Sequence, residues 1–298
     1  MFSDWQHLPA QISPNLIEFG AFQIRYYSLM YLVAFALTYI LVMHRIKKEN
    51  YDYSAETIQD CFVWLIFGLI IGARLGYVLF YNFSYYLVHP LEIILPFDFT
   101  NGIRFVGISG MSYHGGAVGV VLAAVMFCRR RRIDFWRLAD LFAPAIPLGY
   151  TFGRIGNFIN GELYGRATSV AWGMVFPHDP LQIARHPSQL YEAFFEGLVL
   201  FAFLWMIRRK SPFDGFLLAL YLMGYGLARF VIEFYREPDA HIGLVWVSLT
   251  TGQILCLLMM AAGAVILFWR RRSADADPNP KGGERLRQKP LKVSKNQG

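Results

Sequence analysis

The apolar stretch IQDCFVWLIFGLIIGARLGYVLFY, residues 58–81, decides the fold class. It is longer than the roughly 20 mostly apolar residues that an α-helix needs to cross a bilayer. The whole chain has 298 residues, of which 55% are hydrophobic and only 16% charged, and this is too apolar for an ordinary soluble domain of that length. The sequence therefore predicts an all-α integral membrane protein.

Seven such stretches are predicted to be transmembrane helices. They cover residues 26–44, 58–81, 115–128, 138–160, 190–207, 215–235 and 250–269. The third is short unless it extends back through His114, which would place a histidine at the start of a span. Residues 85–97 are apolar but interrupted by polar residues and a proline, so we expect them to be interfacial or re-entrant. The first 23 residues lack the basic segment of a cleavable signal peptide.

Basic residues cluster after the first, third, fifth and seventh predicted spans. These clusters lie at residues 44–48, 129–137, 208–210 and 270–272. Because cytoplasmic loops carry the excess of Lys and Arg, all four clusters predict one topology, with the N-terminus outside and the C-terminus in the cytoplasm. The same residues account for most of the net charge of +7, so we expect no nucleic acid partner.

The composition changes after the last span. Residues 1–272 are predicted to form the membrane domain, whereas residues 273–298 are polar and basic and are predicted to be a disordered cytoplasmic tail. The outer segment at about residues 162–188 is long enough to form a small cap or a movable lid. The three cysteines stand far apart, without ligand spacing, and predict neither a disulfide nor a metal site.

Three arginines are predicted to lie inside the membrane at similar depth. Arg74, Arg154 and Arg229 each begin roughly 10 Å below the outer surface, at about 1.5 Å of rise per residue. A charged side chain in hydrocarbon costs about 2.5–3.5 kcal/mol on insertion scales, so three at one depth predict a shared polar cavity. Arginine suits phosphate in particular because its planar guanidinium stays charged.

Other polar residues gather at the same outer level. The densest segment is GRIGNFINGELYG, residues 153–165, which places Asn157 on the helix face of Arg154 and continues through Asn160 and Glu162. The first span begins near Tyr27, and the third begins with His114. A histidine with an ordinary pKa near 6.5 suits proton transfer at neutral pH.

These residues also have structural interpretations. Arg74 could reach lipid headgroups or pair with a carboxylate as a structural tie, and a lone histidine is often structural. Glu233 lies four residues after Arg229 and three before Arg236, so an internal ion pair on one helix face is expected. One carboxylate does not balance three convergent arginines, and this favours an anionic ligand.

Two other classes of protein fit parts of the pattern. An anion or lipid transporter would also place arginines in a membrane cavity, but it requires a path to both faces, whereas these charges crowd one side. A structural scaffold for other membrane proteins leaves the buried arginines unexplained. An enzyme that acts on an anionic phospholipid at the outer leaflet is therefore the favoured interpretation.

Four segments carry a family resemblance. Residues 153–165, together with 113–116, 185–192 and 229–236, closely resemble the bacterial prolipoprotein diacylglyceryl transferases. The run Gly-Arg-x-Gly-Asn-Phe-x-Asn-x-Glu is highly specific to that family. The similarity extends from Tyr27 through the seventh span, and only the tail after about Arg272 lies outside it.

The resemblance implies an activity and a location. The protein would be a multi-pass enzyme of the bacterial inner membrane, with its N-terminus and active site facing the periplasm. It would transfer the diacylglyceryl group of phosphatidylglycerol to the lipobox cysteine of a prolipoprotein signal peptide and release glycerol phosphate. No cofactor or metal is expected. In the family, the residues matching Arg154 and Arg229 are regarded as essential, and those matching Tyr27, His114, Asn157, Glu162 and Gly165 are associated with function.

The chemistry of such a transfer predicts roles for these residues. The thiol must attack as a thiolate, and a free cysteine has a pKa near 8.5, so a base or a positive field is needed. We expect His114 to be the base, with Glu233 and Tyr27 as supports or alternatives. The predicted catalytic residues are thus His114, Arg154, Arg229 and Tyr27. The predicted substrate-binding residues are Arg74, Arg154, Asn157, Asn160, Glu162, Gly165, Arg229, Glu233 and Arg236.

Overall fold

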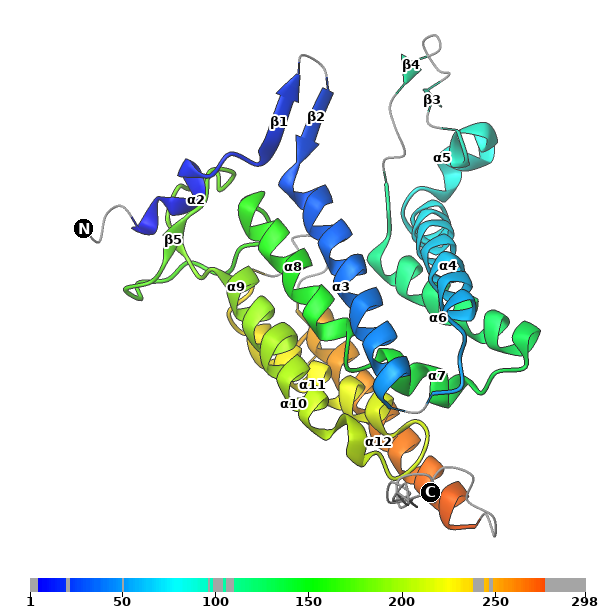
Figure 1. Cartoon of the computed structure of the whole chain (residues 1–298). Helices are drawn as coiled ribbons and strands as arrows, with labels where there is room; N and C mark the ends of the chain where they lie inside the picture. The colour runs from blue at the N-terminus through cyan, green and yellow to red at the C-terminus, as the bar shows by residue number, and fades with distance from the viewer. Residues whose placement is uncertain are drawn as a thin grey trace, which may run out of the picture. The chain divides into compact units, whose positions relative to one another are not determined.

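The computed structural model describes most of the chain (Figure 1). The described residues are 5–19, 22–49, 51–95, 97–98, 104–105, 110–237, 244–246 and 249–276. The chain divides into two compact units, one formed by Met1–Glu49 with Trp136–Gly298 and the other by Asn50–Phe135. Each unit is described separately below. The predicted disordered tail lies outside the described residues, apart from its first four positions.

Helices occupy all seven stretches that the sequence predicts as spans. Five of these stretches are single helices: α3 (Tyr26–Lys48), α4 (Ala55–Tyr81), α6 (Tyr113–Arg131), α11 (Phe216–Ile232) and α12 (Thr251–Asp275). Within the described residues, four helical stretches are long and apolar enough to cross a membrane, namely Tyr26–Lys48, Ala55–Tyr81, Ser188–Lys210 and Thr251–Asp275. The structure is thus that of a mainly helical protein with membrane-spanning character, while seven crossings and their direction stay predictions.

The fourth predicted span is not one continuous helix. The structure divides it into α7 (Phe135–Phe142) and α8 (Ile146–Ile159), joined by a turn. Pro144 lies in this turn, and a proline lacks the N–H that an uninterrupted helix needs. Pro147 is tolerated because it stands in the first turn of α8, where no backbone partner is lost.

The fifth predicted span is a helix of mixed winding. It consists of α9 (Ser188–Glu192), the π-helical segment η2 (Ala193–Val199), α10 (Leu200–Ile207) and the 3₁₀ turn η3 (Arg208–Lys210). A π-helix is rare and is found mostly as a short insertion at functional sites. A π-helical segment in the middle of an apolar span therefore indicates that functional residues lie in this stretch.

In the first unit, α3 lies alongside α8 (Figure 1). A Cβ atom on Gly149 would lie 2.8 Å from Oγ1 of Thr38, and one on Gly156 would lie 3.3 Å from the ring of Tyr27. These two glycines thus allow the close packing that small residues give between membrane helices. Gly153 lies between them in the sequence. A Cβ atom added there would have no atom of a neighbouring segment within 4 Å, so close helix packing does not explain this glycine.

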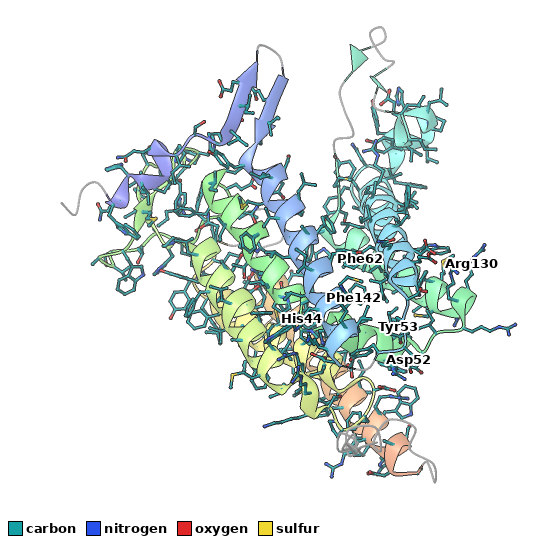
Figure 2. All side chains as sticks on the ribbon, in the orientation of Figure 1. His44, Asp52, Tyr53, Phe62, Arg130 and Phe142 are labelled. Atoms are coloured by element: carbon teal, nitrogen blue, oxygen red, sulfur yellow. The ribbon has the colours of Figure 1, made fainter. Side chains whose placement is uncertain are left out.

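A buried arginine ties the C-terminal end of α3 to α7. Arg45 of α3 is fully buried and donates to the carbonyl oxygens of Asp140 and Leu141, both at 2.6 Å. The Asp140 carboxylate in turn accepts from the backbone N–H groups of Gly215 and Leu218 at 2.9 Å each. It thereby satisfies N–H groups at the start of α11. Phe142, labelled in Figure 2, ends α7 as a buried residue.

The second unit is built on the contact between α4 and α6. Glycines line both helices, and a Cβ atom on Gly119 would lie 2.1 Å from the carbonyl oxygen of Gly68. Exposed Arg130 projects from the last turn of α6 (Figure 2). The predicted interfacial stretch contains the short helices α5 (Phe83–Val88) and η1 (Pro90–Ile93), followed by the antiparallel pair β3 (Phe97–Asp98) and β4 (Arg104–Phe105).

Short strands and one short helix complete the first unit. They are α2 (Leu8–Gln11), the antiparallel pair β1 (Asn15–Phe19) and β2 (Phe22–Arg25), the pair β5 (Met174–Val175) and β6 (Ala184–Arg185), and the pair β7 (Leu244–Trp246) and β8 (Leu249–Thr250). β5 and β6 belong to the predicted cap segment, residues 162–188. This segment has a core of its own, in which Phe158, Met174 and Phe176 are buried and Ile12 packs against them.

A buried ion pair fixes the cap segment. Nε of Arg185 lies 2.7 Å from one carboxylate oxygen of Asp179, and Nη2 lies 2.9 Å from the other. Asp179 is 1% exposed. The hydrogen bonds from Arg185 hold the pKa of Asp179 below its usual range. This pair stabilises the segment at pH values above the ordinary aspartate pKa of about 3.9, and the stabilisation is lost as the pH falls through the lowered value.

We predict that Asp179→Asn loosens the cap segment at neutral pH. Breaking the pair removes the charged acceptor of Nε and Nη2 of buried Arg185, while Nη1 keeps its contact with Glu237 at 3.1 Å. The expected cost is about 1–3 kcal/mol. Amide hydrogen exchange of residues 174–185 should accelerate by about tenfold to a hundredfold at pH 7. The wild type should lose the same protection only below about pH 4. The matched control is Asp275→Asn at the exposed end of α12. Unchanged exchange in Asp179→Asn would show that the pair does not hold the segment.

Candidate functional site

The carboxylate of Glu192 is the centre of the candidate site. Glu192 is the last residue of α9 and is fully buried. Its Oε1 atom lies 2.5 Å from Nη1 of Arg229 and 3.2 Å from Nη1 of Arg236. Its Oε2 atom lies 2.9 Å from Nε of Arg154. One carboxylate therefore gathers three guanidinium groups, which come from α8, from α11 and from just beyond the end of α11.

Two further carboxylates complete this arginine–glutamate network. Glu196 of η2 is also fully buried, and its Oε2 accepts a hydrogen bond from the Tyr150 hydroxyl at 2.5 Å, while Oε1 lies 3.8 Å from Nη1 of Arg229. Glu233 lies 3.0 Å from Nη2 of Arg229 and accepts from the Thr250 hydroxyl at 3.1 Å. The predicted ion pair between Arg229 and Glu233 is therefore confirmed.

The polar segment of α8 continues the network outward. Nε of Arg154 donates to the Tyr150 hydroxyl at 2.6 Å, and Nη1 lies 3.4 Å from the amide oxygen of Asn157. The side chain of Asn157 donates to Glu162 at 2.8 Å, and that of Asn160 reaches the same oxygen at 3.5 Å. The structure thus brings together Arg154, Asn157, Asn160 and Glu162 in one hydrogen-bonded chain.

Tyr27 enters the same region from α3. Its ring contacts the position of Gly156, and its hydroxyl forms a hydrogen bond with Tyr31 at 3.0 Å. Its hydroxyl also interacts with the side chain of Asn157. The predicted catalytic residue Tyr27 is therefore linked to Arg154 through one intervening side chain.

The backbone of Gly165 packs closely against two other chain segments. A Cβ atom at this position would lie 2.4 Å from the carbonyl oxygen of Tyr235 and 2.8 Å from both Cβ and the carbonyl oxygen of His186. Gly165 also forms an isolated β-bridge with Arg236 and donates its N–H to His186 at 2.8 Å. Any larger residue would push apart the chain segments that position Arg236. The structure thus gives Gly165 a packing role between these chain segments, while its role in substrate binding stays a prediction.

Arg74 and His114 lie in the other compact unit. Arg74 donates to the carbonyl oxygens of Glu92, Ile93 and Gly110 at 2.5, 2.9 and 3.3 Å, and its guanidinium lies over the ring of Tyr86. His114 is exposed in the first turn of α6. A common cavity of Arg74 and His114 with Arg154 and Arg229 therefore stays a prediction.

The arginines have more carboxylate partners than the sequence predicted. Glu192 and Glu196 bind them as well as Glu233, so the expectation of a single carboxylate was wrong and the network holds its own counter-charges. A second correction concerns Arg236. α11 ends at Ile232, so Arg236 lies beyond the predicted helix face and reaches Glu192 from the following chain segment.

Sequence reasoning missed three residues of this network, namely Tyr150, Glu192 and Glu196. The two glutamates carried a usable signal, because both lie four residues apart inside a predicted span. A buried carboxylate is as costly in hydrocarbon as a buried arginine, so the depth argument used for arginine finds them equally well. Tyr150 carried no such signal, since tyrosine is common in membrane helices.

The arginine side chains of the network are partly exposed, whereas two of its carboxylates are not. The side chains of Arg154, Arg229 and Arg236 are 13%, 15% and 12% exposed, whereas those of Glu192 and Glu196 are fully buried. Each guanidinium carries five N–H donors in a planar fork that matches phosphate and carboxylate oxygens. The arrangement therefore presents fixed donors to an anionic group and keeps the carboxylates behind them.

Comparisons with known proteins agree with the resemblance in the sequence. The family described as prolipoprotein diacylglyceryl transferase matches residues 14–269. A phosphatidylglycerol–prolipoprotein diacylglyceryl transferase from Chlorobaculum tepidum is 51% identical over 282 residues, covering 94% of this chain and 98% of the relative. Proteins of the same name from Bordetella avium and Treponema denticola are 44% and 41% identical, covering 90% and 87% of this chain and 98% and 93% of their own lengths. The chain therefore belongs to the prolipoprotein diacylglyceryl transferase family.

Proposed function

We propose that the protein transfers the diacylglyceryl group of phosphatidylglycerol to the lipobox cysteine of a prolipoprotein, the first step of bacterial lipoprotein maturation. The observation that carries the proposal is the set of three arginines held on Glu192, which itself lies in a helical stretch long and apolar enough to cross a membrane. The names of the relatives supply the two substrates. The protein would cross the inner membrane seven times, with its N-terminus and active site on the periplasmic side.

The reaction replaces a carbon–oxygen bond by a carbon–sulfur bond. The thiolate of the lipobox cysteine attacks the glycerol carbon of the diacylglyceryl group that bears the phosphate. The bond from this carbon to the phosphate-ester oxygen breaks, and its electron pair leaves with glycerol phosphate. The thiol proton passes to a base, and the product is a thioether. Negative charge therefore grows on the departing phosphate as the bond breaks.

Arg154 and Arg229 are placed to stabilise that charge. Preorganised donors aimed at a developing anion are worth most in a site that excludes water. The contacts of Arg154 with Tyr150 and Glu192 use its Nε atom, which leaves the outer end of the guanidinium directed toward Asn157 and the exposed side of the network. Glu192 fixes both arginines before the lipid arrives, so little reorganisation is required.

Three side chains are candidates for the base that accepts the thiol proton. His114 is the first candidate, because an imidazole suits proton transfer at neutral pH. Tyr27 and Glu233 are alternatives within the unit that holds the network. The carboxylate of Glu233 is already in contact with Arg229, which favours His114 over Glu233.

Purified protein with labelled lipid tests the proposed function. We expect phosphatidylglycerol labelled in its acyl chains to transfer the label to the cysteine of a lipobox peptide, and label in the glycerol headgroup to appear as free glycerol phosphate. A peptide with serine in place of cysteine is the matched control. Uptake of the lipid into sealed vesicles without transfer would instead identify a transporter.

Substitutions of arginine by lysine test whether the guanidinium groups bind the phosphate. Lysine keeps the charge of arginine but loses the planar set of donors. We predict that Arg154→Lys and Arg229→Lys each lower turnover by about a hundredfold to a thousandfold, the usual effect of losing a donor to a developing anion. Arg271→Lys, at the exposed end of α12, is the control. Turnover within threefold of wild type in both site variants would exclude the phosphate-binding role.

His114→Gln separates proton transfer from lipid binding. Glutamine retains a polar side chain but does not accept a proton at neutral pH. We predict that this variant binds phosphatidylglycerol with unchanged affinity and transfers it at least a hundredfold more slowly, within the range of general base catalysis. Raising the pH toward the cysteine pKa should partly restore the rate. Near-normal turnover at pH 7 would remove His114 from the mechanism.

A further inference from the structure

Arg74 of α4 holds three backbone carbonyl groups of its own compact unit. Its Nε donates to Ile93 at 2.9 Å, Nη2 donates to Glu92 at 2.5 Å, and Nη1 donates to Gly110 at 3.3 Å. The guanidinium also lies 5.0 Å from the centre of the Tyr86 ring. Phosphate binds arginine through a pair of parallel N–H groups, and here the pair on Nε and Nη2 already donates to carbonyl oxygens. These contacts favour a structural task for Arg74 over the binding of a lipid headgroup.

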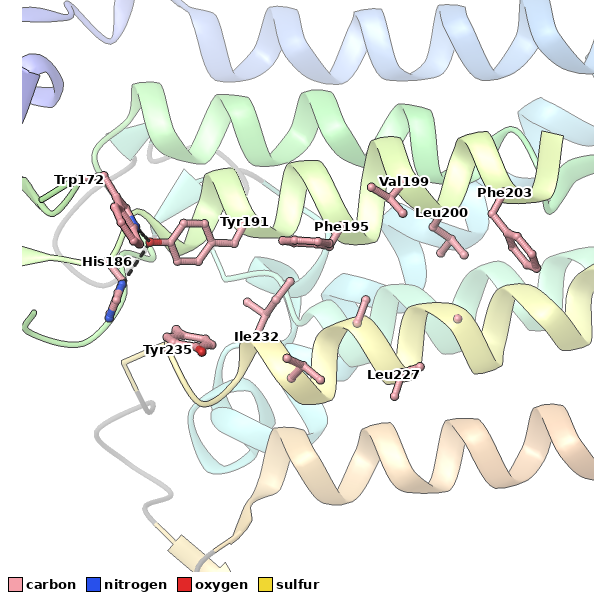
Figure 3. A pocket seen from close by; sticks show the side chains of 13 residues that line it. Trp172, His186, Tyr191, Phe195, Val199, Leu200, Phe203, Leu227, Ile232 and Tyr235 are labelled. Atoms are coloured by element: carbon pink, nitrogen blue, oxygen red, sulfur yellow. Dashed lines mark hydrogen bonds between the residues drawn. The ribbon is translucent and has the colours of Figure 1, made fainter. Parts of the chain in front are cut away.

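The apolar cavity of the other unit does not account for Arg74. This cavity of about 690 Å³ lies between the stretch α9–η2–α10 and α11 (Figure 3). The residues that line it, from Trp172 to Tyr235, all belong to the unit that holds the arginine–glutamate network. The role of Arg74 therefore has to follow from its contacts within residues 50–135.

The carbonyl groups that Arg74 binds belong to backbone outside the long helices. Glu92 and Ile93 are in the 3₁₀ turn η1, and Gly110 precedes α6. At membrane depth an unpaired carbonyl group is costly, and irregular backbone is tolerated there where the protein supplies hydrogen-bond partners. Arg74 supplies such partners on either side of residues 94–109. It therefore fixes the chain just before α6 begins.

Gly110 and the residues that follow it are packed against α4. Gly110 has a φ of 80°, a left-handed conformation that glycine adopts readily, and a Cβ atom there would clash with the ring of Tyr77. The N–H of Ser112 donates to the carbonyl oxygen of Ala73 at 2.9 Å, and Ser112 is buried. Three positions of α4, namely Ala73, Arg74 and Tyr77, therefore hold this short segment.

This segment leads directly to His114. Ser112 is the N-cap of α6, and its hydroxyl accepts from the N–H of Gly115 at 3.2 Å. Gly115 packs against α4 so closely that a Cβ atom on it would clash with the carbonyl oxygen of Gly72. His114 lies between these two fixed residues, and its exposed side chain meets the ring of Tyr113 edge to face. The backbone on both sides of His114 thus sets the direction of its Cα–Cβ bond.

We propose that Arg74 is a positioning residue, which holds residues 110–112 on α4 and thereby aims His114, rather than a ligand of the lipid phosphate. The proposal rests on the role of His114 as the base in the proposed function. A displacement of about 1 Å in a reacting group can cost about a hundredfold in rate. The step that depends on Arg74 is therefore removal of the thiol proton, whereas binding of phosphatidylglycerol is independent of it.

Arg74→Gln tests the proposal by separating kcat from KM. Glutamine has no charge, and its single amide nitrogen does not replace donors on three nitrogens. We expect kcat to fall at least tenfold and KM for phosphatidylglycerol to stay within twofold of the wild type. In a His114→Gln background the same substitution should lower the remaining rate less than twofold, because the group that Arg74 aims is then gone. Arg130→Gln, exposed in the last turn of α6 (Figure 2), is the matched control and should change neither parameter.

Gly110→Ala disturbs the same segment without removing a charged group. The added Cβ atom would clash with Tyr77, and alanine is strained at a φ of 80°. We expect the same pattern, with kcat lowered at least tenfold, KM within twofold, and less than a twofold further loss in the His114→Gln background. Amide exchange at Ser112 should accelerate at least tenfold in both Arg74→Gln and Gly110→Ala, which reports the loosened backbone directly.

Several results would overturn the proposal. A KM raised by the same factor with and without His114 would identify Arg74 as a ligand of the phosphate. A fall in kcat that is equal in both backgrounds would show general damage to the fold. Unchanged kcat in Arg74→Gln would show that these contacts do not position His114. Absence of transfer by the wild type contradicts the proposed function itself and the role of Arg74 with it, whereas near-normal turnover in His114→Gln removes only the base and its positioning residue.

Discussion

The buried carboxylate of Glu192 sets the arrangement of the surrounding helices. An isolated charge without solvent exposure is very costly, so this carboxylate must keep its guanidinium partners. Those partners come from α8, α11 and the segment after α11, and the distances of 2.5–3.2 Å leave little freedom in how these elements approach α9. Without the carboxylate, the three neighbouring guanidinium groups would repel one another. The arrangement of arginines that the proposed function assigns to the phosphate is thus built around an internal anion.

This arrangement also explains why the network holds so many acidic groups. A site with arginines alone would bind any anion tightly in the ground state, and uniform binding does not accelerate a reaction. In the proposed reaction, Glu192, Glu196 and Glu233 would reduce the positive charge that the resting phospholipid meets. The arginine donors would remain in place for the additional charge that develops when the phosphate leaves. The counter-charges would therefore direct the electrostatic stabilisation toward the transition state.

The sequence predicted the positions of the helices but not their interruptions. Every stretch predicted to span the membrane is helical, because length and apolar composition alone determine this in a bilayer. The turn at Pro144 and the π-helical segment Ala193–Val199 depend on local backbone hydrogen bonds, which hydropathy does not report. The pair Arg229–Glu233 followed from helix periodicity, whereas the partners of Glu192 are distant in sequence and needed tertiary structure. Depth along a helix also says nothing about lateral position, so Arg74 could not be placed beside Arg154.

The π-helical segment keeps two buried carboxylates on one arginine. In a regular α-helix, each step of four residues turns the face by about 40°, so Glu192 and Glu196 would point in different directions. A π-helix bonds residue i to i+5 and turns less per residue, which offsets this drift. Glu192 and Glu196 therefore both stay directed at Arg229. One irregular turn thus aligns two of the three carboxylates that surround this guanidinium.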